Sequence, residues 1–209
     1  MKTISKLIRI MTPAVLTIAV LLLSVPARAD IVLSIEDVTG APGSTGTFDV
    51  LLTNTGLTSQ NIAAFNFELN TTDTNITFTD VTTDTTTATY IFPSSFFGPD
   101  ITTFATDQSV EAGDIDATFA GTDVAAGATY GIGNVSYAID PSAPDGDVAE
   151  IDFAAYPQSS LSDSDFNDVP FTPVSGTISV QTSTVPEPSA ALPLAGALLL
   201  AERLIRRRW

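Results

Sequence analysis

Residues 61–69 read Asn-Ile-Ala-Ala-Phe-Asn-Phe-Glu-Leu, and this stretch decides the fold class. Apolar side chains recur at every second position from Phe65 to Leu69, with polar Asn66 and Glu68 between them. Because successive side chains of a strand point to opposite faces of a sheet, the alternation predicts a strand with one buried and one exposed face.

Short runs of the same kind lie on both sides of it, rich in Thr, Val, Ile and Phe and separated by Gly, Asn, Asp and Pro. The predicted strands cover residues 31–35, 47–53, 62–69, 76–80, 130–139, 148–156 and 176–181, with turns at 41–44 and 140–147. No long stretch between the two ends of the chain has a helical period. The pattern predicts an all-β domain over residues 30–181, built as a sandwich of two antiparallel sheets.

Residues 84–113 are less regular and contain several phenylalanines. Phe92, Phe96, Phe97 and Phe104 are predicted to lie on a loop that packs aromatic rings over one end of the sandwich, because burial is the usual fate of such rings. An exposed aromatic platform for a ligand is the alternative.

Basic and acidic residues are separated along the chain. Residues 30–184 contain no Lys or Arg, and they hold 22 of the 24 acidic residues, since only Glu187 and Glu202 lie outside them. Such a surface repels itself and favours divalent cations, basic partners or screening by salt, although solubility alone also explains it. Nucleic acid is excluded as a partner, because its phosphates need Lys and Arg.

The chain has no Cys and no His. A disulfide is therefore impossible, and the commonest general base and transition-metal ligand are missing. Two carboxylates can hydrolyse a glycosidic bond without His, but no nucleophile elbow, phosphate-binding loop or metal-protease helix is present. We expect a domain that is not an enzyme, with a carboxylate-based glycoside hydrolase as the least favoured alternative.

The densest group of oxygen ligands lies in residues 162–168. Asp163, Asp165, Asn167 and Asp168 predict a calcium site, because calcium prefers several carboxylate and amide oxygens on a flexible loop. The spacing is not that of an EF-hand. A solvated acidic loop without a bound ion is the alternative.

The order of strands and turns resembles cohesin modules. The resemblance is carried by residues 34–38, 40–43, 48–55, 61–69, 143–146 and 174–180, which read in turn Ser-Ile-Glu-Asp-Val, Gly-Ala-Pro-Gly, Phe-Asp-Val-Leu-Leu-Thr-Asn-Thr, Asn-Ile-Ala-Ala-Phe-Asn-Phe-Glu-Leu, Ala-Pro-Asp-Gly and Val-Ser-Gly-Thr-Ile-Ser-Val. It implies a jelly-roll sandwich that binds a dockerin-like protein through one exposed sheet. A carbohydrate-binding module for matrix polysaccharide is the alternative, since a fold does not determine a function.

The N-terminal end is predicted to be a signal peptide. A basic stretch opens residues 1–29 and is followed by an apolar run over residues 10–25. Ala27 and Ala29 then fit the small-x-small cleavage pattern, which places the mature start at Asp30 and makes signal peptidase a predicted partner. A retained membrane anchor is the alternative.

The C-terminal end carries a second targeting pattern. After a predicted linker at residues 182–184 the chain reads Val185-Pro186-Glu187-Pro188-Ser189, an apolar run over 190–201, and Arg206-Arg207-Arg208-Trp209. The arginines are expected on the cytoplasmic side of the membrane. The apolar run is shorter than the about 20 residues of a typical membrane helix.

Residues 185–209 resemble the PEP-CTERM sorting signal of Gram-negative bacteria. The resemblance implies an inner-membrane intermediate held by a hydrophobic helix, cleavage by an exosortase, and release to the cell surface or the extracellular space. Proteins with this signal are associated with extracellular polysaccharide and biofilm. A permanent C-terminal anchor is the alternative.

Overall fold

The alternation at the centre of the chain forms a strand, β5 (Ala64–Asn70), in the computed structural model, which describes residues 30–182. Phe65, Phe67 and Leu69 are buried in the core, with exposed fractions of 4%, 0% and 0%. Asn66 and Glu68 lie on the opposite, outer face and remain partly exposed. The predicted two-faced strand is thus confirmed.

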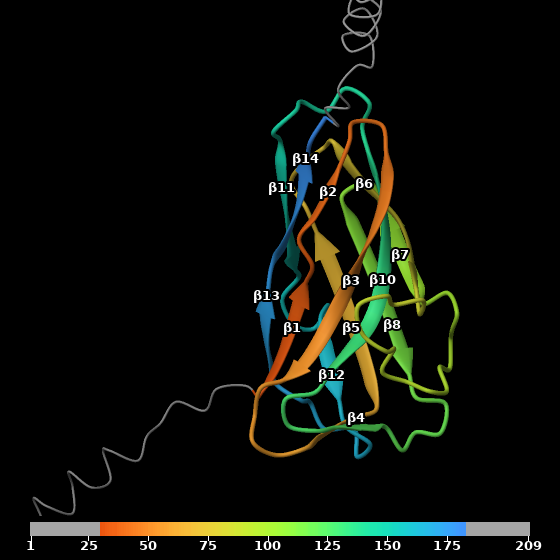
Figure 1. Ribbon diagram of the computed structural model, residues 1–209. Coiled ribbons are helices and arrows are strands. Elements are labelled where there is room, and N and C mark those ends of the chain that lie inside the picture. Colours follow the sequence, from red (N-terminus) through yellow and green to blue (C-terminus); the bar gives the residue numbers. More distant parts are fainter. Residues whose placement is uncertain (1–29, 183–209) are drawn as a thin grey trace, which may run out of the picture.

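Two large sheets pack against each other around this core (Figure 1). The first sheet has the order β13 (Phe171–Val174), β1 (Ile31–Ile35), β3 (Thr45–Asn54), β10 (Thr129–Ile139) and β6 (Ile76–Thr82). The second has the order β2 (Val38–Gly40), β14 (Gly176–Val180), β11 (Val148–Phe153), β5, β8 (Ser109–Ile115) and β7 (Thr102–Thr106), with β12 (Ser160–Ser162) also paired to β5. A small third sheet joins β4 (Gln60–Ile62) to β9 (Thr122–Val124). The predicted all-β sandwich is therefore confirmed.

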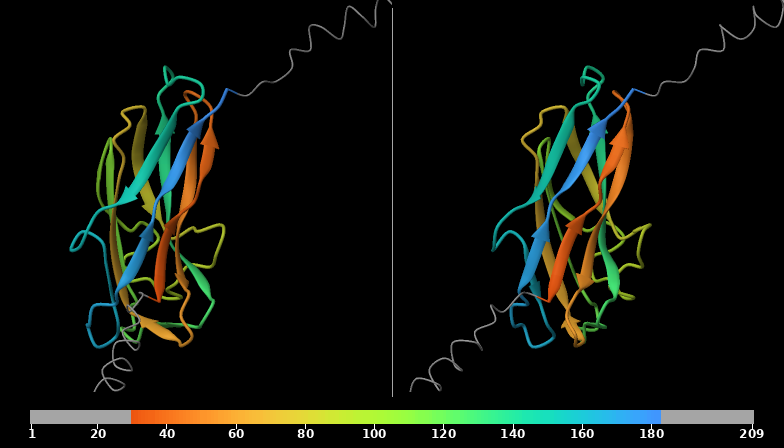
Figure 2. Two further views of the ribbon diagram at one scale, coloured as in Figure 1. Left: turned by 90° about the vertical axis from the view of Figure 1, so that its left-hand side faces the viewer. Right: turned by 60° about the vertical axis from the view of Figure 1, so that its left-hand side comes forward.

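The prediction that both sheets are antiparallel throughout is wrong, because each sheet contains one parallel pair of strands. β13 runs parallel to β1, and β14 runs parallel to β2. Between β1 and β2 the chain crosses from the first sheet to the second. Between β13 and β14 it crosses again, at the same edge of the sandwich and in the same direction (Figure 2). A short turn cannot join neighbouring parallel strands, so only segments that are distant in sequence pair in this way.

The region predicted as irregular, residues 84–113, contains the two strands β7 and β8. In β8, Val110, Ala112, Gly113 and Asp114 are buried, and Val110 is the one large apolar side chain among these four, so the strand shows little alternation. Strand β11 ends at Phe153, earlier than predicted, and the short strands β12 and β13 carry no clear alternation.

Residues 83–101 form a long loop between β6 and β7, here called the edge loop (yellow-green in Figure 1). It bridges the two sheets, since Tyr90 forms a β-bridge with Gly131 of β10 and Ser95 forms one with Asp116 after β8. Phe92 is 3% exposed and stacks on Phe65 of β5, with ring centroids 5.7 Å apart. The edge loop therefore completes the core between the two sheets.

The predicted signal peptide with Ala27 and Ala29, and the sorting signal from Val185 to Trp209, lie outside the described residues. Within residues 30–182, no helix is long and apolar enough to cross a membrane. The start of β1 and the end of β14 lie at opposite ends of the sandwich (Figure 1).

Candidate interaction surface

A buried carboxylate fastens the edge loop to the outer face of the first sheet. Asp49 of β3 is 0% exposed. Its Oδ2 accepts hydrogen bonds from the backbone N–H groups of Thr86 and Thr87, each 2.6 Å long, and its Oδ1 accepts one of 2.6 Å from Asn134 Nδ2. Backbone and side-chain amides thus supply the hydrogen bonds that a buried carboxyl group needs in a domain without basic side chains.

A second buried carboxylate, Asp114 of β8, fastens the other half of the loop. Its Oδ1 accepts hydrogen bonds of 3.1 Å from the N–H groups of Phe96 and Phe97, and its Oδ2 accepts one of 2.7 Å from the Tyr90 hydroxyl. Burial and the neighbouring carboxylate raise the pKa of Tyr90 far above its usual value, so the phenol stays protonated and acts as a donor.

Asp116 organises the next turn of chain. It accepts hydrogen bonds from the Thr118 hydroxyl, 2.5 Å, and the Gly121 N–H, 2.9 Å. Desolvation opposes ionisation of the Asp116 carboxyl, but these hydrogen bonds outweigh it and hold its pKa below the usual value. These three aspartates have structural partners for their oxygens, which favours a positioning role over catalysis.

The outer face of the second sheet is polar and acidic. Its exposed or partly exposed side chains include Asn66, Glu68 and Asn70 of β5, Ser109 and Glu111 of β8, and Glu150 and Asp152 of β11. No Lys or Arg lies anywhere in residues 30–182 to pair with these carboxylates. We call this surface the acidic face.

Two glutamates stand directly opposite each other at the centre of the acidic face. Glu68 of β5 is the register partner of Glu111 of β8. Like charges in that position destabilise a sheet. Neutral donors compensate only in part, through Asn66 Nδ2 to Glu111 Oε1 at 3.2 Å and Ser109 Oγ to Glu68 Oε1 at 3.0 Å. The arrangement favours a cationic group supplied by a partner.

A recess of about 270 Å³ lies beside the two glutamates on the same face. Its lining includes the small residues Ala64, Gly113 and Ser160 from three neighbouring strands, together with the Phe97 side chain from the edge loop. Asn66 lines the recess as well and links it to Glu111 by its hydrogen bond. The recess was not predicted, because its lining comes from distant segments with no shared motif.

Of the four phenylalanines predicted to lie on one packed loop, one is buried and three are about half exposed. Phe92 is buried, as predicted, but Phe96, Phe97 and Phe104 are 55%, 52% and 54% exposed, which agrees with the alternative of an exposed aromatic surface. Phe119, on the loop after β8, is 50% exposed, and its ring centroid lies 6.3 Å from that of Phe96.

The predicted calcium loop forms a tight turn. Asp163 Oδ1 accepts hydrogen bonds of 2.9 Å from the N–H groups of Asp165 and Asn167. Hydrogen bonds from the side-chain and backbone amides of Asn167 are the main reason that the pKa of Asp163 lies below its usual value; desolvation opposes them and the Asp165 N–H adds to them. Asp168 forms a β-bridge with Ser162. Among residues 30–182 no three acidic side chains converge closely enough to hold a metal ion, so calcium at this loop stays a prediction.

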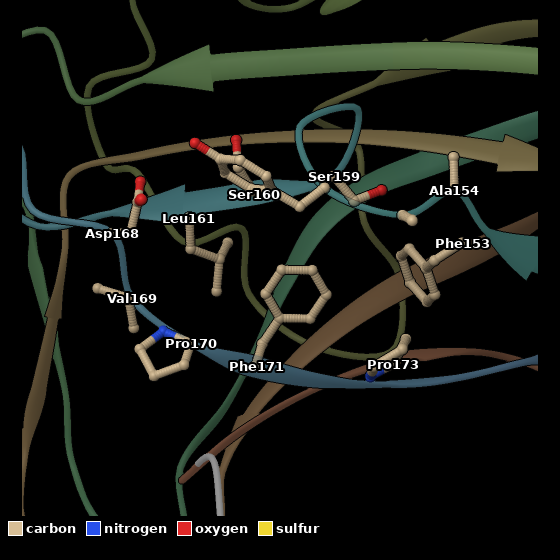
Figure 3. A pocket seen from close by; sticks show the side chains of 12 residues that line it. Phe153, Ala154, Ser159, Ser160, Leu161, Asp168, Val169, Pro170, Phe171 and Pro173 are labelled. Atoms are coloured by element: carbon tan, nitrogen blue, oxygen red, sulfur yellow. The ribbon is translucent and has the colours of Figure 1, made fainter.

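An apolar cleft of about 510 Å³ opens between β12 and β13. Figure 3 shows the side chains of Phe153, Leu161 and Phe171 lying together there, with Val169 and Pro170 beside them. Leu161 and Val169 are almost fully buried, so the cleft leads toward the core at the edge where β11 has ended.

Comparison with solved structures identifies the fold. The chain is similar to the sixth cohesin of scaffoldin B from Acetivibrio cellulolyticus, with a TM-score of 0.56, 19% identity, and coverage of 72% of this chain and 99% of that one. It is also similar to a non-cellulosomal cohesin from the archaeon Archaeoglobus fulgidus, with a TM-score of 0.54, 13% identity, and coverage of 75% and 94%.

A cohesin from Clostridium acetobutylicum, CaCohA2, gives a TM-score of 0.56 at 16% identity over 75% of this chain and 94% of that one. No family profile and no curated protein matches the sequence. Residues 30–182 therefore have a cohesin-like β-sandwich fold, in agreement with the resemblance seen in the sequence.

Proposed function

We propose that this protein is an exported, non-catalytic interaction module that binds a partner protein through the acidic face. The observation that supports this most directly is the opposed pair of Glu68 and Glu111 on the outer face of the second sheet, which has neutral donors but no basic partner in residues 30–182. Carboxylates there cost stability unless a partner supplies positive charge, so their position is better explained by binding than by folding.

The class of partner follows from the similar structures. The cohesin from Acetivibrio cellulolyticus is described in complex with a dockerin, and so is the cohesin OlpA from Clostridium thermocellum. A dockerin-like protein is therefore the partner that we propose for this chain. The cohesin-like fold is typically non-catalytic, which agrees with the structural roles of the three buried aspartates.

The proposed location rests on the sequence alone. A signal peptide ending at Ala29 and a PEP-CTERM signal from Val185 would bring residues 30–184 through the inner membrane to the surface or the extracellular matrix, where exosortase cleavage releases them. The intact mass of the protein from the surface fraction of its own host tests this. A species from Asp30 to residues 185–189 is expected, whereas a mass that keeps Trp209 would mean a permanent anchor.

Direct binding of matrix polysaccharide is the second candidate function. It is favoured by the half-exposed rings of Phe97 and Phe104, since sugar rings stack on exposed aromatic side chains. In that case soluble oligosaccharides prepared from the host matrix would bind the purified protein, and replacement of both rings by alanine would abolish the binding.

Capture of partners from the extracellular fraction of the host tests the acidic face. Glu111→Lys reverses a charge at its centre, and Thr47→Lys, on the exposed outer face of the first sheet, is the matched control. We expect wild type and Thr47→Lys to retain the same protein and Glu111→Lys to lose it. Equal capture by all three proteins would contradict a role for the acidic face.

A further inference from the structure

Three exposed phenylalanines from two separate loops lie together at the rim of the acidic face. We call Phe96, Phe97 and Phe119 the phenylalanine cluster. The ring centroids of Phe96 and Phe97 are 5.0 Å apart and those of Phe96 and Phe119 are 6.3 Å apart, although each ring is about half exposed, at 55%, 52% and 50%. Large apolar side chains that gather on a surface mark an interaction site more often than scattered ones.

The backbone beneath the cluster is held firmly. Asp114 accepts the N–H groups of Phe96 and Phe97, and the Phe119 N–H donates to the Asp116 carbonyl oxygen at 2.8 Å. The Asp114 carboxylate thus fixes the edge loop, and the backbone of Asp116 closes the turn that carries Phe119. The rings are presented in advance of binding, which lowers the entropy cost that a partner must overcome.

Phe119 also adopts a backbone conformation that its side chain disfavours. Its φ angle is +60°, in the left-handed region, where bulky residues are rare and glycine has no steric penalty. The ring does not gain burial in return, since half of it is exposed. Phe166 has the same backbone conformation, but Phe119 differs from it in that its ring lies beside another exposed ring, Phe96, and this pairing points to a use for the Phe119 ring.

The geometry of the rings favours a particular ligand. The planes of Phe96 and Phe97 are inclined by 79° and those of Phe96 and Phe119 by 51°. Such rings do not form the flat platform on which a sugar would stack, whereas an apolar side chain can pack against several edges and faces at once.

The surroundings determine the charge of the ligand. Phe97 lines the recess together with Asn66, and Asn66 donates to Glu111, which is the register partner of Glu68, so the cluster and the glutamates lie on two sides of one residue. A partner that reaches the cluster therefore also meets carboxylates with no basic neighbour in residues 30–182. The same partner must therefore supply an apolar group to the cluster and a positive charge to the carboxylates.

We propose that the phenylalanine cluster is a docking site for a protein segment in which an apolar side chain is flanked by Lys or Arg, the apolar group packing against the rings of the cluster and the cation reaching Glu111. This inference rests on the proposed function, because it specifies the partner's chemistry at the rim of the acidic face. It assigns a binding role to residues that no catalytic or structural argument uses.

Fluorescence anisotropy with three labelled peptides on the purified full chain tests the chemistry. The probes contain the sequences Lys-Phe-Lys, Lys-Ser-Lys and Glu-Phe-Glu between glycine spacers. We expect the first to bind and the second to bind about tenfold more weakly, because the buried benzyl group is lost. The third should not bind. Equal binding of Glu-Phe-Glu would overturn the proposal, and so would equal binding of Lys-Ser-Lys.

Matched variants test the location. Phe119→Gly should weaken Lys-Phe-Lys binding while the melting temperature stays or rises, a combination that a merely structural role would not produce. Phe166→Gly is the control, because Phe166 has a φ of +62° and is 80% exposed but lies outside the cluster. It should leave binding unchanged. Unchanged binding in both Phe119→Gly and Phe97→Ala would overturn the proposal.

Two further results separate this inference from the proposed function. Partner capture that is lost in Glu111→Lys but unaffected by Phe97→Ala would keep the acidic face and reject the phenylalanine cluster. Neutral matrix oligosaccharides that bind wild type and not Phe97→Ala, with Lys-Phe-Lys binding the two equally, would assign the cluster to glycan and overturn the proposal. Capture that is independent of Glu111 would reject the proposed function, while the peptides still decide the role of the cluster.

Discussion

At the scale of single residues, the described domain manages its charges without a single basic side chain. Asp49, Asp114 and Asp116 are almost fully buried, where an unpaired carboxylate would be very costly. Each accepts hydrogen bonds from backbone amides of a loop that it fastens. A carboxylate can accept several donors at once, so it can organise a segment that has no regular hydrogen bonding of its own. Asp163, on the surface, accepts backbone hydrogen bonds in the same way.

Replacement of Asp49 by alanine should destabilise the fold substantially. The N–H groups of Thr86 and Thr87 and the Asn134 amide would all lose their acceptor, and we expect the free energy of unfolding to fall by about 3 kcal/mol. Urea denaturation measures this. Asp84→Ala, an exposed position in the same loop, should change the free energy of unfolding by less than about 0.5 kcal/mol. Similar losses in both variants would contradict the role assigned to Asp49.

Asn167→Ala should raise the pKa of Asp163 toward 3.8, because hydrogen bonds from Asn167 are the main cause of its depression. A depressed native pKa means that this contribution to stability is present above pH 3.8 and is lost as the pH falls through the native value. Carboxyl ¹³C NMR titration measures the shift. Asp140, whose low pKa depends on Ser142, should titrate as before and serves as the internal control. An unchanged Asp163 titration would show that the turn does not depend on Asn167.

At the scale of elements, strands in which apolar and polar side chains alternate clearly were predictable from the sequence. The strands and loops that form the candidate interaction surface were not. β5 is evident from Phe65 to Leu69, whereas β8 buries Val110, Ala112, Gly113 and Asp114, a pattern with too few large apolar residues to separate it from a loop. The polar face of β5 already pointed to Glu68 as an exposed residue. The partner strand that brings Glu111 opposite it depends on long-range pairing, which no local pattern encodes.

The edge loop shows how one element can serve both core and surface. Phe92→Ala should lower the free energy of unfolding by about 3 kcal/mol, because it empties a site that is packed against Phe65. Phe96→Ala, four residues later, should cost less than about 1 kcal/mol, since its ring is half exposed. Chemical denaturation of the pair measures the difference. Equal costs would mean that the exposed rings stabilise the fold and that their exposure has no functional meaning.

At the scale of the whole molecule, self-repulsion is the dominant electrostatic property of residues 30–184. These residues contain 22 carboxyl groups and no basic side chain, so a salt that does not denature proteins, such as sodium chloride, should raise the melting temperature by screening. If the acidic face binds its partner as proposed, that partner should be basic and the association should depend strongly on ionic strength. A bound divalent cation would act differently, because its effect depends on the identity of the ion and on a particular set of oxygens.

Calcium and sodium compared at equal ionic strength distinguish these two effects. If residues 163–168 bind calcium, calcium chloride should raise the melting temperature more than sodium chloride does, because binding to the native state alone adds to screening. Asp163→Asn should remove that excess, and Asp140→Asn, which also removes one charge with a depressed pKa, should keep it. Differential scanning calorimetry of the three proteins measures the shifts. Equal shifts in both salts would reduce the acidic loop to a hydrogen-bonded turn and leave screening as the only response of this domain to cations.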